Sequence, residues 1–409
     1  MELRRGRRSP EVLKRVVELG GNARSYKEAS HTLQRQTEIK ITTKETQTLT
    51  EQTGTDWAVA RDEQVEQFKQ GTLERLHAQA PEVAAVMIDG AYIQTRAAAG
   101  SQGVHGQGWH EFKCASLATL SSTVSAIDPQ PEPPAKFLNP ERVKRIVTEV
   151  AERHGPVNSA PKPQAESKPK PKRKKPRTCL TRRVVRLVTT FVASLRTSAE
   201  FGYMAAAETF LRGLDLAKRK GFICDGLLYN WTIYETHFRQ LGFIPILDFL
   251  HLLTHLYTAA QALESSPWRA WQRYEQWLRW AWAGERAALL KALQQASAKV
   301  GLPPPNAQEH DRRAVLARTV TYVVNNYDRI DYPRYRKQGL PYSSAPVESA
   351  VKQFCRRVKG SEMFWIAPGA EGALQVRAAY LSQDNRVERL WARPPQAHAY
   401  GTNWRDIAA

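Results

Sequence analysis

The chain begins with short amphipathic segments, each preceded by a residue that commonly caps helices. Within residues 9–56, Ser9 precedes a proline at the first helical position, and Ser25 opens a Ser-x-x-Glu capping box. Thr42 offers a third start of the same form. The Gly-Gly pair at 20–21 is expected to end the first helix. The pattern predicts three short helices joined by tight turns.

Three such helices fit a helix-turn-helix module. The last helix is polar, and Lys44 and Gln47 are the residues in it that we expect to contact DNA. The alternative is an N-terminal helical cap, because this helix has little apolar content beyond Leu49. Residues 57–80 are expected to form a helical connector.

The pattern then changes to the apolar runs that are typical of buried strands. Residues 83–88 are continuously apolar and end in Asp89-Gly90, and residues 91–96 extend the same strand. A Gly/Gln/Ser-rich turn over 100–108 leads to a second strand over 109–122. A hairpin is the natural connection between the two strands.

Residues 128–178 are interpreted as a segment without regular structure. Four prolines lie between residues 129 and 134, and residues 161–178 contain eight Lys/Arg and one Glu. This composition predicts a disordered basic linker. Its run Lys172-Arg173-Lys174-Lys175 is expected to lie along DNA phosphates. The alternative is a solvated insertion with no dedicated role.

Beyond residue 180 the pattern is mainly helical, with two further apolar runs. We expect amphipathic helices over 181–195 and 198–218, a strand over 221–226 that again ends in Asp-Gly, a helix over 227–240, an apolar run over 243–248, and helices over 264–300, 307–325, 346–359 and 370–382. Five tryptophans of segment 264–300 follow helical steps, and we expect them to form the core of a helical insertion rather than a base-stacking platform: Trp268, Trp271, Trp277, Trp280 and Trp282.

Charge and composition narrow the class of protein. The 409 residues include 60 Lys+Arg and 40 Asp+Glu, a net charge of +20, which favours a nucleic acid or another polyanion as the partner. The four cysteines are far apart and form no Cys-x-x-Cys motif, so neither a zinc finger nor a disulfide framework is expected. The N-terminus lacks the apolar core of a signal peptide, and the longest apolar stretch is too short for a bilayer. We expect two or three structural units in a soluble, intracellular protein.

Two of the apolar strands end in a carboxylate. Asp89 and Asp225 are each followed by a glycine, which allows close approach to the backbone. Buried carboxylates are costly unless they pair or bind a cation, and Mg²⁺ prefers such oxygen ligands. Glu348 lies in the first turn of a basic helix. Each Asp-Gly alone is a common turn, and Glu348 alone could complement the helix dipole. The order strand-Asp, strand-Asp, helix-Glu in so basic a chain favours two-metal phosphoryl transfer.

These residues, in this order, resemble a known family. The chain looks like a DDE transposase of a prokaryotic insertion-sequence family, of the Mutator-like kind with an RNase H-like catalytic core. The motifs that carry the resemblance are Met87-Ile88-Asp89-Gly90-Ala91-Tyr92, Trp109-His110-Glu111-Phe112-Lys113, Cys224-Asp225-Gly226 with Trp231 on the next helix, Leu247-Asp248-Phe249-Leu250-His251, and Val347-Glu348-Ser349 with Arg357, Lys359 and Trp365. The match covers residues 80–122 and 200–382.

The resemblance implies an α/β fold, with an RNase H-like mixed sheet flanked by helices, an all-α insertion and the N-terminal helix-turn-helix-like module. It implies that Asp89, Asp225 and Glu348 hold two Mg²⁺ ions, for which Mn²⁺ substitutes. Asp248 is the rival of Asp225 as the second ligand, because it also ends an apolar run, although it opens a helix and fits an N-cap. His251 is expected to position the scissile phosphate or the neighbouring ligands, the alternative being a core histidine on an apolar helix.

Further residues follow from the same motifs. The basic side chains expected to contact DNA are Lys113, Arg356, Arg357 and Lys359, with a solvated face as the open alternative for Lys113 and Arg357. The ancillary residues are Trp109, Glu111 and Trp231.

The expected organisation has six segments: a DNA-binding module (1–56), a connector with the first part of the catalytic core (57–127), the disordered basic insertion (128–180), the second part of the core (181–263), the all-α insertion (264–340), and the catalytic Glu helix with a C-terminal tail (341–409).

The expected function is DNA transposition: metal-dependent phosphodiester hydrolysis at the ends of a mobile element, followed by strand transfer into target DNA. The partner is double-stranded DNA and no membrane is involved. At least two protomers are expected in the active assembly, because two element ends must be joined, and we expect the protein in the cytoplasm with the nucleoid. The alternatives are an RNase H-like nuclease that cuts without joining and a catalytically inactive DNA-binding regulator. Retention of all three carboxylates argues against the inactive regulator.

Overall fold

The computed structural model describes residues 9–76, 79–96, 108–154, 184–360 and 363–393. The chain forms two compact units. The first unit combines residues up to Leu120 with Arg186–Pro245 and the part from Ser344 onward, and the second combines Ser121–Val185 with Ile246–Ser343.

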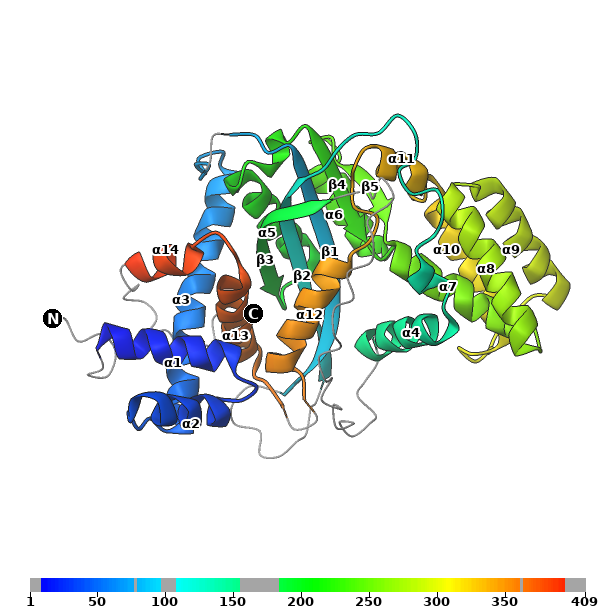
Figure 1. Cartoon of the computed structure of the whole chain (residues 1–409). Helices are drawn as coiled ribbons and strands as arrows, with labels where there is room; N and C mark the ends of the chain where they lie inside the picture. Colours follow the sequence, from blue (N-terminus) through cyan, green and yellow to red (C-terminus); the bar gives the residue numbers. More distant parts are fainter. Residues whose placement is uncertain (1–8, 77–78, 97–107, 155–183, 361–362, 394–409) are drawn as a thin grey trace, which may run out of the picture. The chain divides into compact units, whose positions relative to one another are not determined.

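The first unit is built on a five-stranded mixed sheet flanked by helices (Figure 1). Its order is β3-β2-β1-β4-β5, with bounds Val83–Thr95 (β1), Gly108–Ser121 (β2), Val185–Ser194 (β3), Arg219–Cys224 (β4) and Ile244–Leu247 (β5). The α/β class predicted from the sequence is therefore confirmed.

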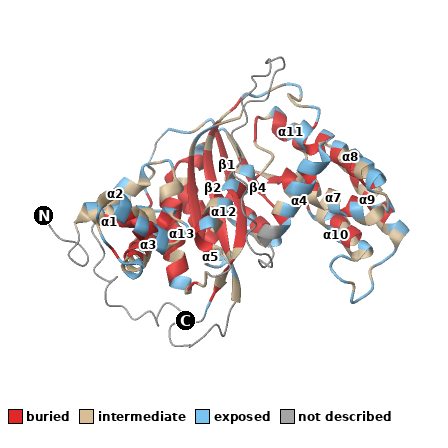
Figure 2. Ribbon diagram, turned by 60° about the horizontal axis from the view of Figure 1, so that its bottom comes forward, coloured by how far each residue is buried: buried red, intermediate tan, exposed pale blue. Residues whose placement is uncertain are grey.

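Strand β1 is the central strand of this sheet. It pairs antiparallel with β2, from Val83 opposite Leu120 to Thr95 opposite Gly108, and parallel with β4. The predicted hairpin is confirmed, while most of its predicted turn lies outside the described residues. Every residue from Val83 to Ala91 is buried, as the red strands of Figure 2 show, which explains the continuous apolar run in the sequence.

The predicted helix over 181–195 is wrong, because Val185–Ser194 forms strand β3. This segment, Val-Arg-Leu-Val-Thr-Thr-Phe-Val-Ala-Ser, is rich in β-branched residues, which fit strands better than helices. Its second half is buried without interruption, whereas a surface helix would bury only a stripe. The amphipathic pattern of its first half resembles that of a helix, although the segment forms a strand.

Helix α5 (Ser198–Leu211) is shorter than predicted. It opens with a capping box between Thr197 and Glu200, as its sequence indicates. It ends before Gly213, which adopts a left-handed φ of 64° and leads through a short 3-10 turn, η2 (Leu214–Leu216), into β4. After β4 the chain forms α6 (Leu228–Ile233) and a π-helical turn, η3 (Tyr234–Phe238).

The three predicted N-terminal helices are present as α1 (Pro10–Asn22), α2 (Tyr26–Thr37) and α3 (Thr43–Lys69). Their caps are the predicted ones, since the side chains of Ser9, Ser25 and Thr42 each accept a hydrogen bond from a backbone N–H of the first turn. Helix α3 runs through residue 56, so the predicted boundary between module and connector falls inside a helix.

The Gly-Gly pair at 20–21 does not end α1, contrary to the prediction. A Cβ atom on Gly20 would lie 2.0 Å from the Thr50 hydroxyl oxygen, and one on Gly21 would lie 2.5 Å from the side chain of Val376. The two glycines therefore allow α3 and the C-terminal helix α13 (Ala367–Leu381) to approach α1 closely.

Helices α3 and α13 are in backbone contact. A Cβ atom on Gly54 of α3 would lie 2.1 Å from the carbonyl oxygen of Gly372 in α13. The N-terminal helices and α13 also share one apolar core, formed by Leu13, Val16, Val17, Leu33, Ile41, Leu49, Trp57, Val376 and Ala379. The N-terminal helices are thus an integral part of the first unit rather than a detached arm.

Two more helices complete the first unit, α12 (Ala345–Val358) and α14 (Arg386–Ala392). Helix α12 crosses in front of β1 and β2 in Figure 1. It packs against β1, and its Phe354 ring lies 6.0 Å from the ring of Phe112 in β2.

The second unit is largely helical. Its elements are η1 (Ala135–Phe137), α4 (Pro140–His154), α7 (Phe249–Leu263), α8 (Pro267–Ala283), α9 (Arg286–Val300), α10 (Arg312–Asn325), η4 (Tyr327–Arg329) and α11 (Tyr332–Lys337). The regular elements within residues 264–340 are helical, as predicted for this segment. Of its five tryptophans, Trp277 and Trp282 are core residues as predicted, whereas Trp268 is 66% exposed.

The prediction that the linker lacks structure is wrong for residues 128–154. The Trp282 indole N–H donates to the Gln130 carbonyl at 2.9 Å, the Tyr274 hydroxyl donates to the Phe137 carbonyl at 3.0 Å, and Asp128 pairs with Arg336. The proline-rich part of this segment packs against α8, and helix α4 follows it in the chain. The rest of the linker, including the run 172–175, lies outside the described residues.

None of the helices in the described part of the chain combines the length and apolar character needed to cross a membrane.

The contact between α3 and α13 generates a prediction about stability. Gly54→Ala should lower the free energy of unfolding by about 2–3 kcal/mol, because the two backbones must separate to admit a methyl group. Urea denaturation measures this change. The control is Gly71→Asn, at a left-handed φ of 73° with open space around it, which should cost under about 1 kcal/mol. An unchanged stability for Gly54→Ala would contradict the close contact.

Candidate metal centre

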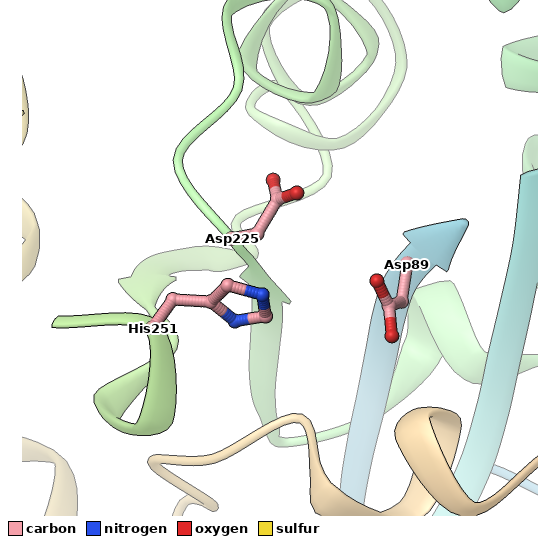
Figure 3. Close-up of side chains that lie close together, drawn as sticks. All are labelled: Asp89, Asp225 and His251. Carbon is pink, nitrogen blue, oxygen red and sulfur yellow. The ribbon is translucent and has the colours of Figure 1, made fainter. Parts of the chain in front are cut away.

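Two buried carboxylates converge at neighbouring strands of the first unit. Asp89 lies within β1, and Asp225 follows the last residue of β4 (Figure 3). The parallel register pairs Met87 with Ile223, so the two aspartates stand at equivalent positions on adjacent strands. One carboxylate oxygen of each lies within 4.8 Å of the other. Asp89 is 1% exposed and Asp225 is 7% exposed.

The glycine after each aspartate has a steric or conformational reason to be there. A Cβ atom on Gly90 would lie 2.8 Å from the Glu111 carboxylate and 2.9 Å from the Phe112 carbonyl oxygen of β2. Gly226 has a φ of 93°, where other residues are strained, and it turns the chain out of the sheet towards α6. The glycines of both Asp-Gly pairs thus shape the backbone beside the two carboxylates.

Hydrogen bonds orient both carboxylates. Asp225 Oδ1 accepts from the backbone N–H of Leu227 at 3.0 Å and from the side-chain amide of Asn230 at 2.9 Å. Asp89 Oδ1 accepts from the backbone N–H of Gly90 at 2.9 Å. Asn230 is fully buried and was missed in the sequence. The sequence signal that could have identified it is a polar residue in the first turn of the helix that follows Asp225.

The electrostatics of the pair favour a cation. At an effective dielectric constant of about 20, two unit charges at this separation repel by on the order of 3 kcal/mol. Tyr229 reports the same negative field, because burial, and then the charges of Asp225, Glu111 and Asp89, raise the pKa of its hydroxyl and keep it protonated. That hydroxyl donates to Glu111 at 2.8 Å. Burial, and then the Asp89 charge, likewise raise the pKa of the Cys114 thiol, which lies opposite Asp89 in β2.

The third predicted ligand, Glu348, lies in the first turn of α12 and is buried. The hydroxyl of Ser344 lies 3.4 Å from its Oε1. Glu348 belongs to the buried face of α12 that includes Val351 and Phe354, and this helix packs on β1. Asp89, Asp225 and Glu348 are therefore carried by three contiguous elements of one unit: β1, the strand beside it and a helix packed on it.

The second unit contains its own buried pair, Asp248 and His251. Asp248 is the N-cap of α7, and it accepts from the backbone N–H of His251 at 3.0 Å. The imidazole Nδ1 lies 2.6 Å from the same carboxylate oxygen. The N-cap role considered for Asp248 is thus observed. The positioning role of His251, which Figure 3 also labels, stays a prediction.

The residues expected to contact DNA differ in their exposure to solvent. Lys113 is 8% exposed and donates to the Arg196 carbonyl at 3.2 Å, and Arg357 is 2% exposed. Neither side chain is presented to solvent, as a phosphate contact requires. Lys44 and Arg356 are exposed. The amide of Gln47 donates to Glu51 at 2.9 Å, inside the N-terminal helices.

The ancillary residues have structural partners. Lys359 places its ammonium group 5.8 Å from the centre of the Trp109 ring. Glu111 accepts from Tyr229 and lies 3.7 Å from Lys113. Trp231 is buried and packs against Phe222 of β4, with 6.3 Å between ring centres.

Comparisons with known proteins found no family model and no curated protein that matches the chain. A ligand at this site is therefore inferred from the chemistry of its carboxylates. Carboxylate oxygens gathered at strand ends, held by hydrogen bonds and nearly shielded from water, fit a hard divalent cation such as Mg²⁺.

The buried pair generates a prediction that needs no enzymatic assay. In EDTA, Asp225→Asn should raise the melting temperature by a few degrees, because it removes the repulsion while its amide oxygen still accepts from Leu227 and Asn230. Millimolar Mg²⁺ should raise the melting temperature of the wild type, since a bound ion stabilises the folded state, but not that of the variant. Differential scanning calorimetry measures both.

Asp215→Asn is the matched control. Asp215 pairs with Arg75, with 2.7 Å between Oδ2 and the guanidinium, so its loss should lower the melting temperature equally with and without Mg²⁺. If Asp225→Asn behaved like Asp215→Asn, Asp225 would be a structural carboxylate rather than a metal ligand.

Proposed function

We propose that the protein is a DNA transposase of the DDE type, with an RNase H-like catalytic core. The observation that carries the proposal is the pair of buried carboxylates, Asp89 and Asp225, on adjacent strands of a mixed sheet, with Glu348 on the helix packed against it. The net charge of +20 supports DNA as the substrate. The motif order described above supports a transposase rather than another metal-dependent enzyme.

In this proposal Asp89, Asp225 and Glu348 hold two Mg²⁺ ions. When bound, such ions lower the pKa of an attacking oxygen and stabilise the charge on the leaving oxygen. The protein's own part is positioning. The bonds from Leu227 and Asn230 fix the Asp225 carboxylate, and the Gly90 N–H fixes that of Asp89, so that neither has to reorganise during the reaction.

The reaction has two in-line displacements at phosphorus. Water first attacks a phosphodiester at the end of the element, so that one P–O bond forms, the P–O3′ bond breaks, and a 3′-hydroxyl and a 5′-phosphate result. The freed 3′-hydroxyl then attacks a phosphodiester of target DNA, loses its proton and displaces a second 3′-hydroxyl. Neither step needs a covalent protein intermediate or an oxidant.

The test is cleavage of a supercoiled plasmid that carries the native element ends, in Mg²⁺, Mn²⁺ or EDTA. Nicking at the ends and strand-transfer products are expected with either metal and not in EDTA. Asp225→Asn should lower the cleavage rate by at least a thousandfold while it still binds the DNA.

Each of the other outcomes would indicate a different function or a different metal ligand. Nicking without strand transfer would indicate a nuclease, and DNA binding without any nicking would indicate a regulator that has lost catalysis. Cleavage that survives Asp225→Asn but is lost in Asp248→Asn would move the second ligand to Asp248.

The proposal also predicts the assembly state on DNA. Two element ends must be joined, so a complex with DNA that carries both ends should contain at least two protomers. Light scattering that resolves the protein mass from the DNA mass measures the number of protomers in the complex. A cleavage-competent complex with a single protomer would contradict the prediction.

A further inference from the structure

Arg357 has an unusual environment for a basic residue of a DNA-binding protein. It lies on α12, nine residues beyond Glu348, and it is 2% exposed. Its Nε donates to the carbonyl oxygen of Gly20 at 2.7 Å. Gly20 lies in the last turn of α1, where backbone carbonyls lack partners within the helix and carry partial negative charge. A guanidinium therefore complements the end of α1 in both charge and hydrogen bonding.

Two aromatic rings enclose the same guanidinium. Its carbon lies 4.0 Å from the centre of the Tyr26 ring in α2 and 5.2 Å from that of Trp365. The two rings are 6.2 Å apart in an edge-on arrangement. Cations lie favourably over aromatic faces, and the planar guanidinium does so better than an ammonium group. Arg357 thus joins α12 to both α1 and α2.

Trp365 extends this junction to the strand that carries Asp89. Its backbone N–H donates to the Gln94 carbonyl at 3.0 Å, and its carbonyl accepts from the Arg96 N–H at 2.9 Å. Its indole N–H donates to the carbonyl of Val358, the last residue of α12, at 2.8 Å. The end of β1 and the end of α12 are therefore held by the same tryptophan.

Tyr26 extends the junction to the helix predicted to read DNA. Its hydroxyl donates to Glu51 of α3 at 3.2 Å, and Glu51 also accepts from Gln47 at 2.9 Å. One connected set of contacts thus runs from the first turns of α3, through Tyr26 and Arg357, into the helix of Glu348.

From this geometry we infer that Arg357 is a positioning residue of the metal centre, which docks the Glu348 helix onto the N-terminal helices. The inference rests on the proposed function. At 1.5 Å per residue, Glu348 lies about 13 Å along α12 from Arg357, and a helix of this length moves as a rod. Docking at one end therefore fixes the carboxylate near the other end.

The test separates metal binding, DNA binding and stability. Arg357→Met keeps the apolar volume but removes the charge and the donor. We expect the Mg²⁺ concentration for half-maximal plasmid cleavage to rise at least tenfold, and Mn²⁺ affinity measured by calorimetry on the protein alone to fall by a similar factor. DNA affinity should change less than twofold. Arg357→Lys, which keeps a donor for Gly20, should recover part of the metal affinity.

The matched control is Arg212→Met. Arg212 is also buried and also donates to a carbonyl, that of Leu117 at 2.6 Å, but it joins α5 to the sheet and does not touch the N-terminal helices. It should lower the melting temperature and leave Mn²⁺ affinity unchanged. If Arg357→Met does not fold, Tyr26→Leu removes the closer ring while keeping an apolar side chain, and the same rise in metal requirement is expected.

Two results would overturn the inference, and a third would overturn the proposed function on which it rests. A folded Arg357→Met with wild-type Mn²⁺ affinity would show that the contact is structural only. A variant that loses DNA affinity at an unchanged metal requirement would make Arg357 a DNA contact, as the sequence predicted. A wild-type protein that binds no Mn²⁺ would instead contradict the proposed function itself, so the two failures are distinguishable.

Discussion

The burial of two carboxylates on adjacent strands, which costs free energy, is the main electrostatic constraint on the first unit. Asp89 and Asp225 lie within 4.8 Å of each other with little access to water, and no arrangement of apolar neighbours removes that cost. The surroundings instead hold the two groups in place. Asn230 and the turn at Gly226 orient one of them, and the glycine after Asp89 leaves room for Glu111. In the proposed function, a divalent cation bound by the two carboxylates offsets this cost.

The parts of the fold that could be predicted from sequence are those with a strong local signal. The continuous apolar run before Asp89 belongs to the central strand, which is covered on both sides, so burial and sequence agree. The capping residues Ser9, Ser25 and Thr42 also act locally, within one helical turn. The two Asp-Gly pairs indicated where two carboxylates lie close together, because parallel strands bring equivalent positions to one place.

What could not be predicted depends on contacts between distant segments. Strand β3 has a polar first half and a buried second half, and its partner in the sheet decides its conformation. Gly20 and Gly21 look like a helix end, yet they serve packing against Thr50 and Val376. Arg357 looks like a phosphate contact beside other basic residues, and only the positions of Gly20 and Tyr26 make it a buried connector. In each case a residue far along the chain overrides the local preference.

The contact between α3 and α13 also bears on how the protein is made. Residues 43–69 meet their packing partner only after residues 367–381 have been synthesised, because Gly54 must close against Gly372. Contacts of such large sequence separation form late and slow folding. The N-terminal helices therefore gain Val376 and Ala379, the part of their shared core that α13 supplies, only after more than 300 further residues have been made. Synthesis of α13 thus acts as a checkpoint on the packing of the N-terminal helices.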